Sequence, residues 1–586
     1  MTTFHILAMH LNPEFAALLQ NNDVPSELTI LEVTESLKAP LNELEEVEAE
    51  IQRLRELMKT MKTKRQRIQK IINDHNIILA PARRLPPDVL HEIFFHCLPT
   101  RHNPIMKHLE SPLLLTRICS SWRAIALSSP RIWSKIHIPL PGDPSLSESG
   151  NGIITDETSL SNRRQRFARI LQLRCDAVRR WLSRTGTCPL SLSVIYPGYF
   201  PGVHNLNDEL THEMFDILLS YADRWSDVNL SMPEAIYNKL QSNINPTTFS
   251  ILKSLKINLY PDIFATNNTQ PIPIRLLAVP GLRKIALDAI LVTLKLPGST
   301  IQPNWTQITH ITIASSTDDR YLLILLRQCP NLVFGNFQVL TSDWSNESIV
   351  DQDEVLLPHL ESLEIDDSGT YENMAAIFKA IKAPALTRLS YQGFNEPSLE
   401  DNSTIPPPIP VLPLLENSTL ISDLSLDGRL SSQDTHECLQ RGARVTRMVF
   451  GKPPYVNGLR VLPDTIPPDI VDLRILSTGS LDMNPLPRLE SLEAYQLSSL
   501  TDEDLLDVIT SRINASKQGE TAALKSVKIS FQRRRQKDIT EDVSRIAEEA
   551  GIEVKLDLTY LPEEGFTFLK RLSPSFGLTS NNDVVF

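Results

Sequence analysis

At 586 residues the chain is too long for a single hydrophobic core, so several domains or an array of repeats are expected. Hydrophobic residues make up 41% and charged residues 22%, which is typical of a soluble globular protein. The net charge of -12 argues against general binding to nucleic acid or to an anionic membrane, because neither attracts an acidic surface. The sequence has no run of about 18 apolar residues, so we expect no transmembrane helix.

The cysteines are scattered and form no CxxC pair, which indicates neither a disulfide framework nor a zinc knuckle. They are Cys97, Cys119, Cys175, Cys188, Cys329 and Cys438. Buried free thiols in a reducing compartment are the simplest expectation. The first residues lack the basic region of a signal peptide. We therefore expect a cytoplasmic and/or nuclear protein.

Residues 1–35 are expected to be poorly ordered, and a helix is predicted over 36–80, starting near Pro40. Its apolar residues follow steps of three and four, with Arg65 the one charged member of the series, so they lie on one stripe: Leu44, Val47, Ile51, Leu54, Met58, Met61, Ile68 and Ile72. Acidic residues fill the first half and basic residues the second, which complements the helix dipole. The pattern is typical of a coiled coil. A homodimer through this helix is one interpretation, and a helix that folds back on its own chain is the other.

Residues 81–139 hold a series of short helical segments. Leu85-Pro86 precedes the first helix, and proline is favourable in a first helical turn. Apolar residues fall on one face of this helix and also off it, so a small bundle cannot cover all of them and a partner is expected to do so. A second helix is predicted from Leu114, Leu115, Ile118, Cys119, Trp122, Ile125 and Ala126. Pro130, Ile132 and Trp133 begin a third element, which Ile136 and Ile138 close.

The segment LPPDVLHEIF, followed in order by LTRICSSWRAIALSSPRIW, resembles the F-box, and especially the F-box proteins common in fungi. The resemblance implies an all-helical bundle that binds a Skp-type adaptor, which in turn binds a cullin. It places Leu85 and Pro86 on the dipeptide that contacts the adaptor. Leu90, Ile93, Leu115, Ile118 and Trp122 fall on positions that build the bundle or line the interface. The alternative is a helical bundle that serves only as core.

A group of histidines overlaps this region, together with one cysteine: His91, His96, Cys97, His102 and His108. Imidazole and thiolate are zinc ligands, but the spacing fits no compact zinc motif. We expect neither a metal nor a cofactor.

Residues 140–160 are rich in Pro, Gly, Ser and acidic residues and predict a linker. Across 161–586 three apolar residues recur at positions one, four and six of a short motif. The motif occurs as Trp225-Val228-Leu230, Leu252-Leu255-Ile257, Leu282-Ile285-Leu287, Ile308-Ile311-Ile313, Leu360-Leu363-Ile365, Leu386-Leu389-Tyr391, Ile421-Leu424-Leu426, Val445-Met448-Phe450, Ile470-Leu473-Ile475, Leu489-Leu492-Ala494 and Leu524-Val527-Ile529. Most copies lie about 24 to 30 residues apart, the period of a leucine-rich repeat. Helices are predicted over 319–332, 371–386 and 502–514, and a helix followed by a strand over 547–561.

The expected fold class is therefore an α+β or α/β repeat protein: an N-terminal coiled-coil helix, a small all-helical F-box and an irregular leucine-rich-repeat solenoid. A mixed α/β domain with strands that merely look alike is the alternative to the solenoid. The sequence contains no P-loop, GxGxxG, GxSxG or HExxH motif, so we expect no catalytic residues. The F-box resemblance implies the substrate-recognition subunit of an SCF-type E3 ubiquitin ligase, with an unknown protein substrate held by the repeats. A scaffold that uses the F-box without ubiquitin transfer is the alternative.

Overall fold

The structure is a computed structural model, and it describes residues 18, 24–141, 157–196, 209–260, 274–289, 303–340, 354–367, 371–393, 409–426, 432–451, 455–456, 459–460, 473–476, 486–497 and 499–560. The chain divides into two compact units, Met1–Leu90 and His91–Phe586. The boundary lies within helix α3 (Pro87–His96). Among the described helices, none is both long enough and apolar enough to cross a bilayer.

The first unit consists mainly of one long helix, α2 (Glu27–Leu79), followed by the short 3-10 helix η2 (Pro81–Arg84). Ser26 caps its start, because the Ser26 hydroxyl accepts a hydrogen bond from the Thr29 N–H at 3.2 Å. The prediction that the helix begins near Pro40 and that residues 1–35 are poorly ordered is wrong for 27–35. Pro40 lies inside α2. A proline removes one backbone hydrogen bond, and here the turns on both sides continue the helix past it.

The second unit is built on one sheet of 14 strands, in which every pair of neighbours is parallel. The strands follow chain order as β1 (Lys135–Pro139), β2 (Leu190–Ile195), β3 (Trp225–Pro233), β4 (Ser254–Tyr260), β5 (Lys284–Ala289), β6 (His310–Asp318), β7 (Phe334–Leu340), β9 (Ser362–Asp367), β11 (Arg388–Gly393), β12 (Asp423–Leu426), β13 (Arg447–Phe450), β16 (Ser491–Leu497), β17 (Ser526–Phe531) and β18 (Lys555–Thr559). Two further pairs are small: β8 (Val355–Leu356) with β10 (Ile381–Lys382), and β14 (Tyr455–Val456) with β15 (Leu459–Arg460).

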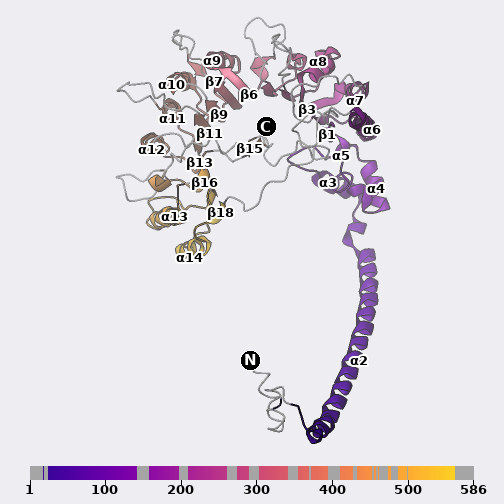
Figure 1. The fold of residues 1–586 in the computed structure, drawn as a ribbon. Helices are drawn as coiled ribbons and strands as arrows, with labels where there is room; N and C mark the ends of the chain where they lie inside the picture. Colours follow the sequence, from indigo (N-terminus) through magenta and orange to yellow (C-terminus); the bar gives the residue numbers. More distant parts are fainter. Residues whose placement is uncertain are drawn as a thin grey trace. The chain divides into compact units, whose positions relative to one another are not determined.

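Helices connect most of the strands and lie along one side of the sheet (Figure 1). The α-helices are α4 (Ser120–Leu127), α5 (Pro130–Trp133), α6 (Glu157–Leu182), α7 (Glu209–Leu219), α8 (Glu234–Ser242), α9 (Asp319–Gln328), α10 (Tyr371–Ala380), α11 (Leu412–Asn417), α12 (Ser432–Arg441), α13 (Asp502–Lys517) and α14 (Thr540–Ala550). The 3-10 turns are η3 (Leu115–Arg117), η4 (Ala222–Arg224), η5 (Pro246–Thr248), η6 (Arg275–Ala278), η7 (Trp305–Gln307) and η9 (Leu473–Leu476).

Equivalent apolar residues of successive strands stand in register across the sheet. Val228 pairs with Leu255, and the row continues through Ile285, Ile311, Gly335, Leu363, Leu389, Leu424, Met448, Leu492 and Val527. The leucine, isoleucine and valine side chains of this row are buried. The helices cover this face, since the Phe378 ring of α10 lies 5.5 Å from the Tyr391 ring of β11. Alternate residues of each strand therefore form a continuous apolar layer beneath the helices.

A second regular feature is the backbone hydrogen bonding between the turns that precede successive strands. In each turn one backbone carbonyl accepts two N–H groups from the start of the next strand, as the Arg283 carbonyl does from Thr309 and His310. The same arrangement recurs at Lys253, Thr309, Val333, Glu361, Thr387, Ser422, Thr446 and Glu490. Hydroxyl groups reinforce it, because Thr387 donates to the Glu361 carbonyl at 3.0 Å and Thr446 to the Ser422 carbonyl at 3.2 Å. Each unit thus holds the next with the same backbone geometry.

The recurring sequence motif marks the strands in all but one of its copies. In the exception, Ile470-Leu473-Ile475, the structure has the turn η9. Leu473 and Leu476 are both buried there, and a three-residue spacing suits a 3-10 turn as well as it suits the motif. The motif did not detect strand β7, because Gly335 stands where the motif has its central apolar residue. A Cβ atom there would lie 2.7 Å from the Phe337 ring, which fills that space instead.

The predicted helices are present, two of them shorter and one of them longer than expected. Helix α9 ends at Gln328, and α10 ends at Ala380, after which the chain forms β10 rather than continuing to 386. Helix α13 extends to Lys517, and the predicted helix and strand near the end are α14 and β18.

The predicted boundaries of the all-helical region and of the linker need correction. Ile136 and Ile138, expected to close a helical bundle over 81–139, belong to β1 and pair with Leu192 and Val194 of β2. The strand is buried on both sides from Ile136 to Pro139, so these isoleucines belong to the sheet core. The sheet therefore begins before the linker predicted at 140–160. Most of that linker lies outside the described residues, and its last residues belong to α6.

Candidate functional site

Helix α3 carries apolar side chains on two sides. Leu90 and Phe94, one turn apart, are buried, at 4% and 0% exposure. Val89 and Ile93, also one turn apart, remain exposed, Ile93 by 37%. The helix therefore buries one face within the chain and leaves a second apolar face in solvent.

The predicted second helix is interrupted at Cys119. The segment forms the turn η3 and then helix α4, because the Cys119 backbone is extended (φ -154°) and its sulfur accepts a hydrogen bond from the Trp122 N–H at 3.4 Å. Cys119 is thus the N-cap of α4 rather than part of a longer helix. Leu114 and Ile118 both have helical backbone angles and flank η3 on its two ends.

Several contacts hold α3 against α4 and α5. The Phe94 and Trp122 rings lie 5.0 Å apart. Arg131 places its guanidinium 3.5 Å from the centre of the Phe95 ring and forms an ion pair with Glu92 at 2.8 Å. The His91 ring bonds to the Ser129 hydroxyl, so this histidine has a structural partner. Among the described residues, no group of three or more His, Cys, Asp or Glu side chains is placed to hold a metal ion.

The structure sorts the predicted adaptor-binding residues into three groups. Leu90 and Leu115 are buried, and Leu85 and Trp122 are half-buried. Pro86, Ile93 and Ile118 are exposed, Ile118 by 52%. Helical spacing identifies faces but not which face the chain itself covers, so the sequence grouped buried and exposed residues together. Val89, which lies off the first apolar face of α3, is exposed, and so are Leu114 and Leu127, which the hydrophobic pattern did not single out as exposed.

The thiols of this region differ from expectation. Cys97 and Cys119 are exposed free cysteines, so the prediction of buried thiols is wrong for these two. Cys97 lies just past the end of α3 and not on its apolar face. Cys175, Cys329 and Cys438 are buried as expected, and burial raises the pKa of Cys329 and of Cys438 to about 12.

Two tryptophans fix α4 and α5 to the sheet. The Trp133 indole N–H donates to the Ala126 carbonyl at 2.7 Å, and the Trp181 indole N–H donates to the Trp133 carbonyl at 2.8 Å. The two rings meet edge to face at 4.8 Å. Both rings are buried. Helices α4 and α5 are therefore anchored to α6 and β1 through packed aromatic side chains.

The face of the sheet opposite the helices is mostly polar. Its central row in register is interrupted by Ala286, Thr312 and Val449, and its other members from β3 onward are Asn229, Lys256, Asn336, Glu364, Ser390, Ser425, Glu493 and Lys528. The side chains of these other members are half-buried or exposed, while their neighbours along each strand are buried. The alternation gives a broad surface of amide, hydroxyl and charged groups across many strands.

The charged groups near the C-terminal strands form one network. Arg447 donates to Glu493 at 2.7 Å, and the Tyr495 hydroxyl donates to the other oxygen of Glu493 at 2.6 Å. Burial raises the pKa of a carboxyl, but here the hydrogen bonds from Tyr495 and Arg447 outweigh it and hold the pKa of Glu493 below its usual value. Lys528 lies 5.7 Å from the Tyr495 ring centre. This network is preorganised before any partner arrives.

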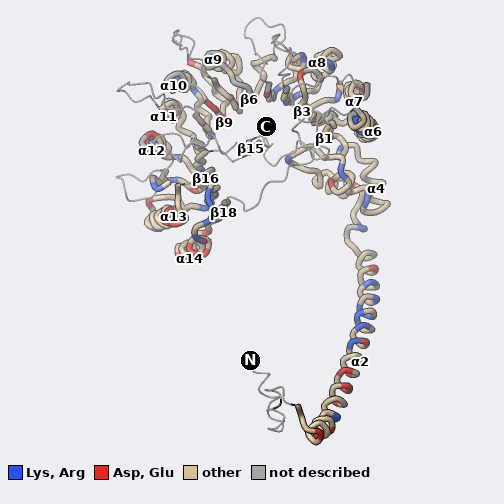
Figure 2. The backbone as a smooth tube through the Cα atoms, viewed as in Figure 1, with Lys and Arg blue, Asp and Glu red and all other residues tan. Residues whose placement is uncertain are grey.

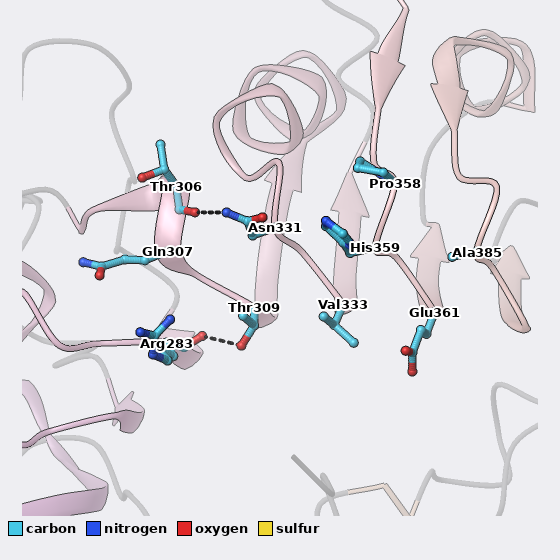
Figure 3. Close-up of a pocket in the computed structure, with 10 residues that line it drawn as sticks. All are labelled: Arg283, Thr306, Gln307, Thr309, Asn331, Val333, Pro358, His359, Glu361 and Ala385. Carbon is cyan, nitrogen blue, oxygen red and sulfur yellow. Dashed lines mark hydrogen bonds between the residues drawn. The ribbon is translucent and has the colours of Figure 1, made fainter.

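A hollow of about 430 Å³ lies at the edge where β5, β6, β7, β9 and β11 begin (Figure 3). Its polar groups are largely committed to the turns, since Asn331 donates to the Thr306 carbonyl at 2.7 Å and Thr309 donates to the Arg283 carbonyl at 3.2 Å (Figure 3). His359 and Glu361 are exposed, and Figure 3 shows their side chains pointing apart. No serine, cysteine or lysine is among the residues that line the hollow.

Comparisons with known proteins add little to this description. No family model matches the chain, and no curated protein matches it. Among solved structures, the chain is similar to the crystal structure of a protein from Bacteroides fragilis, at 10% sequence identity and a TM-score of 0.26, covering 72% of this chain and 88% of that one. At that TM-score the likeness carries no argument about fold or function.

Proposed function

We propose that this protein is the substrate receptor of an SCF-type E3 ubiquitin ligase. Its α3–α5 region would act as an F-box that binds a Skp-type adaptor and, through it, a cullin. The repeated sheet would act as an irregular leucine-rich-repeat solenoid that holds a protein substrate. On this proposal the chain contributes binding and geometry, and performs no chemistry itself.

The observation that carries the proposal is the apolar face left open in this region. Ile93, Leu114 and Ile118 are exposed, while Leu90, Phe94 and Leu115 beside them in the sequence are buried. Grouped exposed apolar side chains mark surfaces that partners cover. Burial of a leucine-sized side chain is worth about 1.5 to 3 kcal/mol, so a few such residues support a stable contact after the cost of association.

The sheet supports the second half of the proposal. Its strands run in chain order, keep one register and repeat one turn geometry from Lys253 to Glu490. Solenoids combine these properties with an extended surface for partners. The polar sheet face, with Lys256, Glu364 and the Arg447–Glu493 pair, offers such a surface. A polar surface suits a partner that binds and leaves more than a permanent subunit.

The tryptophan anchor supports the geometry that a receptor needs. Ubiquitin transfer by proximity requires a substrate held at a defined distance from the conjugating enzyme. Trp133 and Trp181 join α5 to α6 without a linker between α5 and β1. A substrate on the sheet would therefore keep a fixed position relative to an adaptor on α4.

Co-precipitation of the full-length protein with its Skp-type adaptor and cullin tests the proposal. We expect the wild type to recover both proteins and a Leu85→Ala/Pro86→Ala variant to recover much less of either. A Leu420→Ala variant is the control, because Leu420 is 47% exposed and lies outside the helical region. Equal recovery by all three proteins contradicts the proposal.

A second function shares the first step: a scaffold that binds the adaptor without ubiquitin transfer. The same exposed residues favour it equally. Recovery of the adaptor without cullin would support this scaffold, and recovery of both would support the ligase subunit.

A further inference from the structure

Helix α2 exposes an apolar stripe along its whole length. None of its described side chains is buried. The stripe predicted from the sequence is exposed at every apolar position, from 43% at Ile51 to 57% at Met58. Because α2 begins at Glu27, Ile30 and Leu37 extend the same series of steps of three and four toward the N-terminus, and both are exposed. A soluble helix with such a stripe requires a partner along it.

Charge divides α2 into two halves. Figure 2 shows acidic residues concentrated in one part of the helix and basic residues in the next. The acidic half contains Glu43, Glu45, Glu46, Glu48 and Glu50, and the basic half contains Lys59, Lys62, Lys64, Arg65, Arg67 and Lys70. A partner with the opposite arrangement would complement it along its full length.

A second α2 helix running in the opposite direction has that arrangement. If Ile51 faces Met61 of the second copy, the other apolar residues also meet in layers, with Leu54 facing Met58 and Leu44 facing Ile68. In this register the residues that flank the stripe bring Glu48 beside Lys62 and Glu50 beside Lys64 of the second copy, and one like-charge pair, Arg55 with Arg55, falls at the centre. Flanking residues of this kind set the orientation and choice of partner in coiled coils. By symmetry each opposite-charge pair occurs twice.

The parallel arrangement conflicts with the same residues. It would place Arg65 within the stripe directly against Arg65 of the second copy. It would also place Glu43 beside Glu48 of the second copy, and the acidic halves of the two helices would lie side by side. Like charges in a partly dehydrated contact are destabilising. Antiparallel pairing instead puts Arg65 opposite Val47, where its long side chain reaches the glutamates on either side.

We propose that α2 pairs with α2 of a second copy of this chain to form an antiparallel coiled-coil dimer. The proposal is independent of the function proposed above. It places the C-terminal ends of the two helices at opposite ends of the pair. Two receptors joined in this way would engage a repeated or oligomeric target with higher avidity than one receptor.

The mass of the full-length protein in solution tests the pairing. We expect sedimentation equilibrium to give the mass of a dimer for the wild type. Ile51→Asp, which places a charge in the stripe of both copies, is expected to raise the dissociation constant of the dimer at least about 100-fold. Ala49→Asp is the matched control, because it adds the same charge to the same helix two residues away and off the stripe, and we expect it to leave the dimer intact. A monomeric wild type, or equal loss in both variants, overturns the proposal.

Zero-length cross-linking tests the orientation. A carbodiimide joins carboxylates to lysines that touch, and residues 48 and 62 lie about 21 Å apart along a single helix, so a link between them must join two helices. We mix isotopically light and heavy copies of the full-length protein and expect mixed-mass links from Glu48 to Lys62 and from Glu50 to Lys64. A dimer without these links contradicts antiparallel pairing, and links from α2 to residues 91–560 of the same copy indicate instead a helix that folds back. Recovery of the Skp-type adaptor by Ile51→Asp separates a failure of dimerisation from a failure of the proposed receptor function.

Discussion

The sheet and the helical regions differ in the burial of their apolar side chains. Along the sheet, Leu255, Leu363 and Leu389 are almost wholly buried, and most of the strands carry polar residues on the other face. In α2 and α3, and at the two ends of η3, residues with the same chemistry stay exposed. The same kind of side chain thus stabilises the chain's own fold in the sheet, and on the helices we propose that it binds another molecule. Mutations in the two regions should therefore affect different measurements.

The largest effect on stability is expected at Asp502, at the C-terminal end of the sheet. Its buried carboxylate accepts hydrogen bonds from Arg533 at 2.7 Å, from Tyr560 at 3.0 Å, and from the N–H groups of Gln536 and Lys537. Asp502→Ala leaves Arg533 without its partner, and breaking a buried pair costs about 3 to 5 kcal/mol. Urea denaturation measures this cost. Asp542→Ala, which breaks an exposed pair with Arg545, is the control and should cost less than about 1 kcal/mol.

Leu389→Ala should lower the free energy of unfolding by about 2 to 5 kcal/mol, because it leaves a cavity in the apolar layer under the helices. The Leu389→Ala substitution should leave recovery of the Skp-type adaptor unchanged at temperatures where the protein stays folded. Urea denaturation and co-precipitation of the same sample measure the two effects. A change below about 0.5 kcal/mol would mean that the sheet does not depend on this layer for its stability.

The Asp502 contact also predicts how stability depends on pH. Burial opposes ionisation, but hydrogen bonds from Arg533, Lys537 and Gln536 outweigh it and hold the pKa of Asp502 below its usual value of 3.8. A lowered pKa stabilises the fold above the unfolded value and loses that contribution as pH falls through the folded value. The free energy of unfolding should therefore fall below about pH 4, and less steeply in Asp502→Asn. Parallel slopes for the two proteins would contradict this assignment.

Leu114→Ala should have the smallest effect on stability, because Leu114 is already 38% exposed. We expect the free energy of unfolding to change by less than about 0.5 kcal/mol, as for surface substitutions in general, while recovery of the Skp-type adaptor falls. Leu389→Ala is expected to lower stability but not adaptor recovery, and Leu114→Ala is expected to lower adaptor recovery but not stability. Loss of stability in Leu114→Ala without loss of adaptor would remove the distinction between the two regions.

Sequence patterns predicted the strands and helices better than the contacts that these elements make with the rest of the chain. The spacing of Leu252, Leu255 and Ile257 is typical of a strand whose apolar side faces inward, and it located most strands of the sheet. The pattern failed at Gly335, where the space for a side chain is filled by Phe337 from the same strand. It also failed at Cys119, because a cysteine sulfur that caps a helix leaves no mark in the hydrophobic periodicity.

The sequence did not predict which apolar residues of α3 are exposed. The resemblance to the F-box placed Leu90 and Ile93 together among positions that build the bundle or line the interface, yet contacts from distant parts of the chain decide which of them is covered. Phe94 packs on Trp122, and Arg131 covers Phe95, so one side of α3 is closed and Ile93 remains open. These contacts join residues far apart in sequence, and periodicity within one helix carries no information about them.

The affinity of the purified full-length protein for a purified Skp-type adaptor tests the central claim most directly, by isothermal titration calorimetry. Ile118→Asp puts a charge on a side chain that is 52% exposed, and Leu420→Asp makes the same change at one that is 47% exposed, in the turn before β12. We predict that the wild type and Leu420→Asp bind alike and that Ile118→Asp binds at least about 10-fold more weakly. Equal affinity of all three proteins, or no binding by the wild type, would contradict the account.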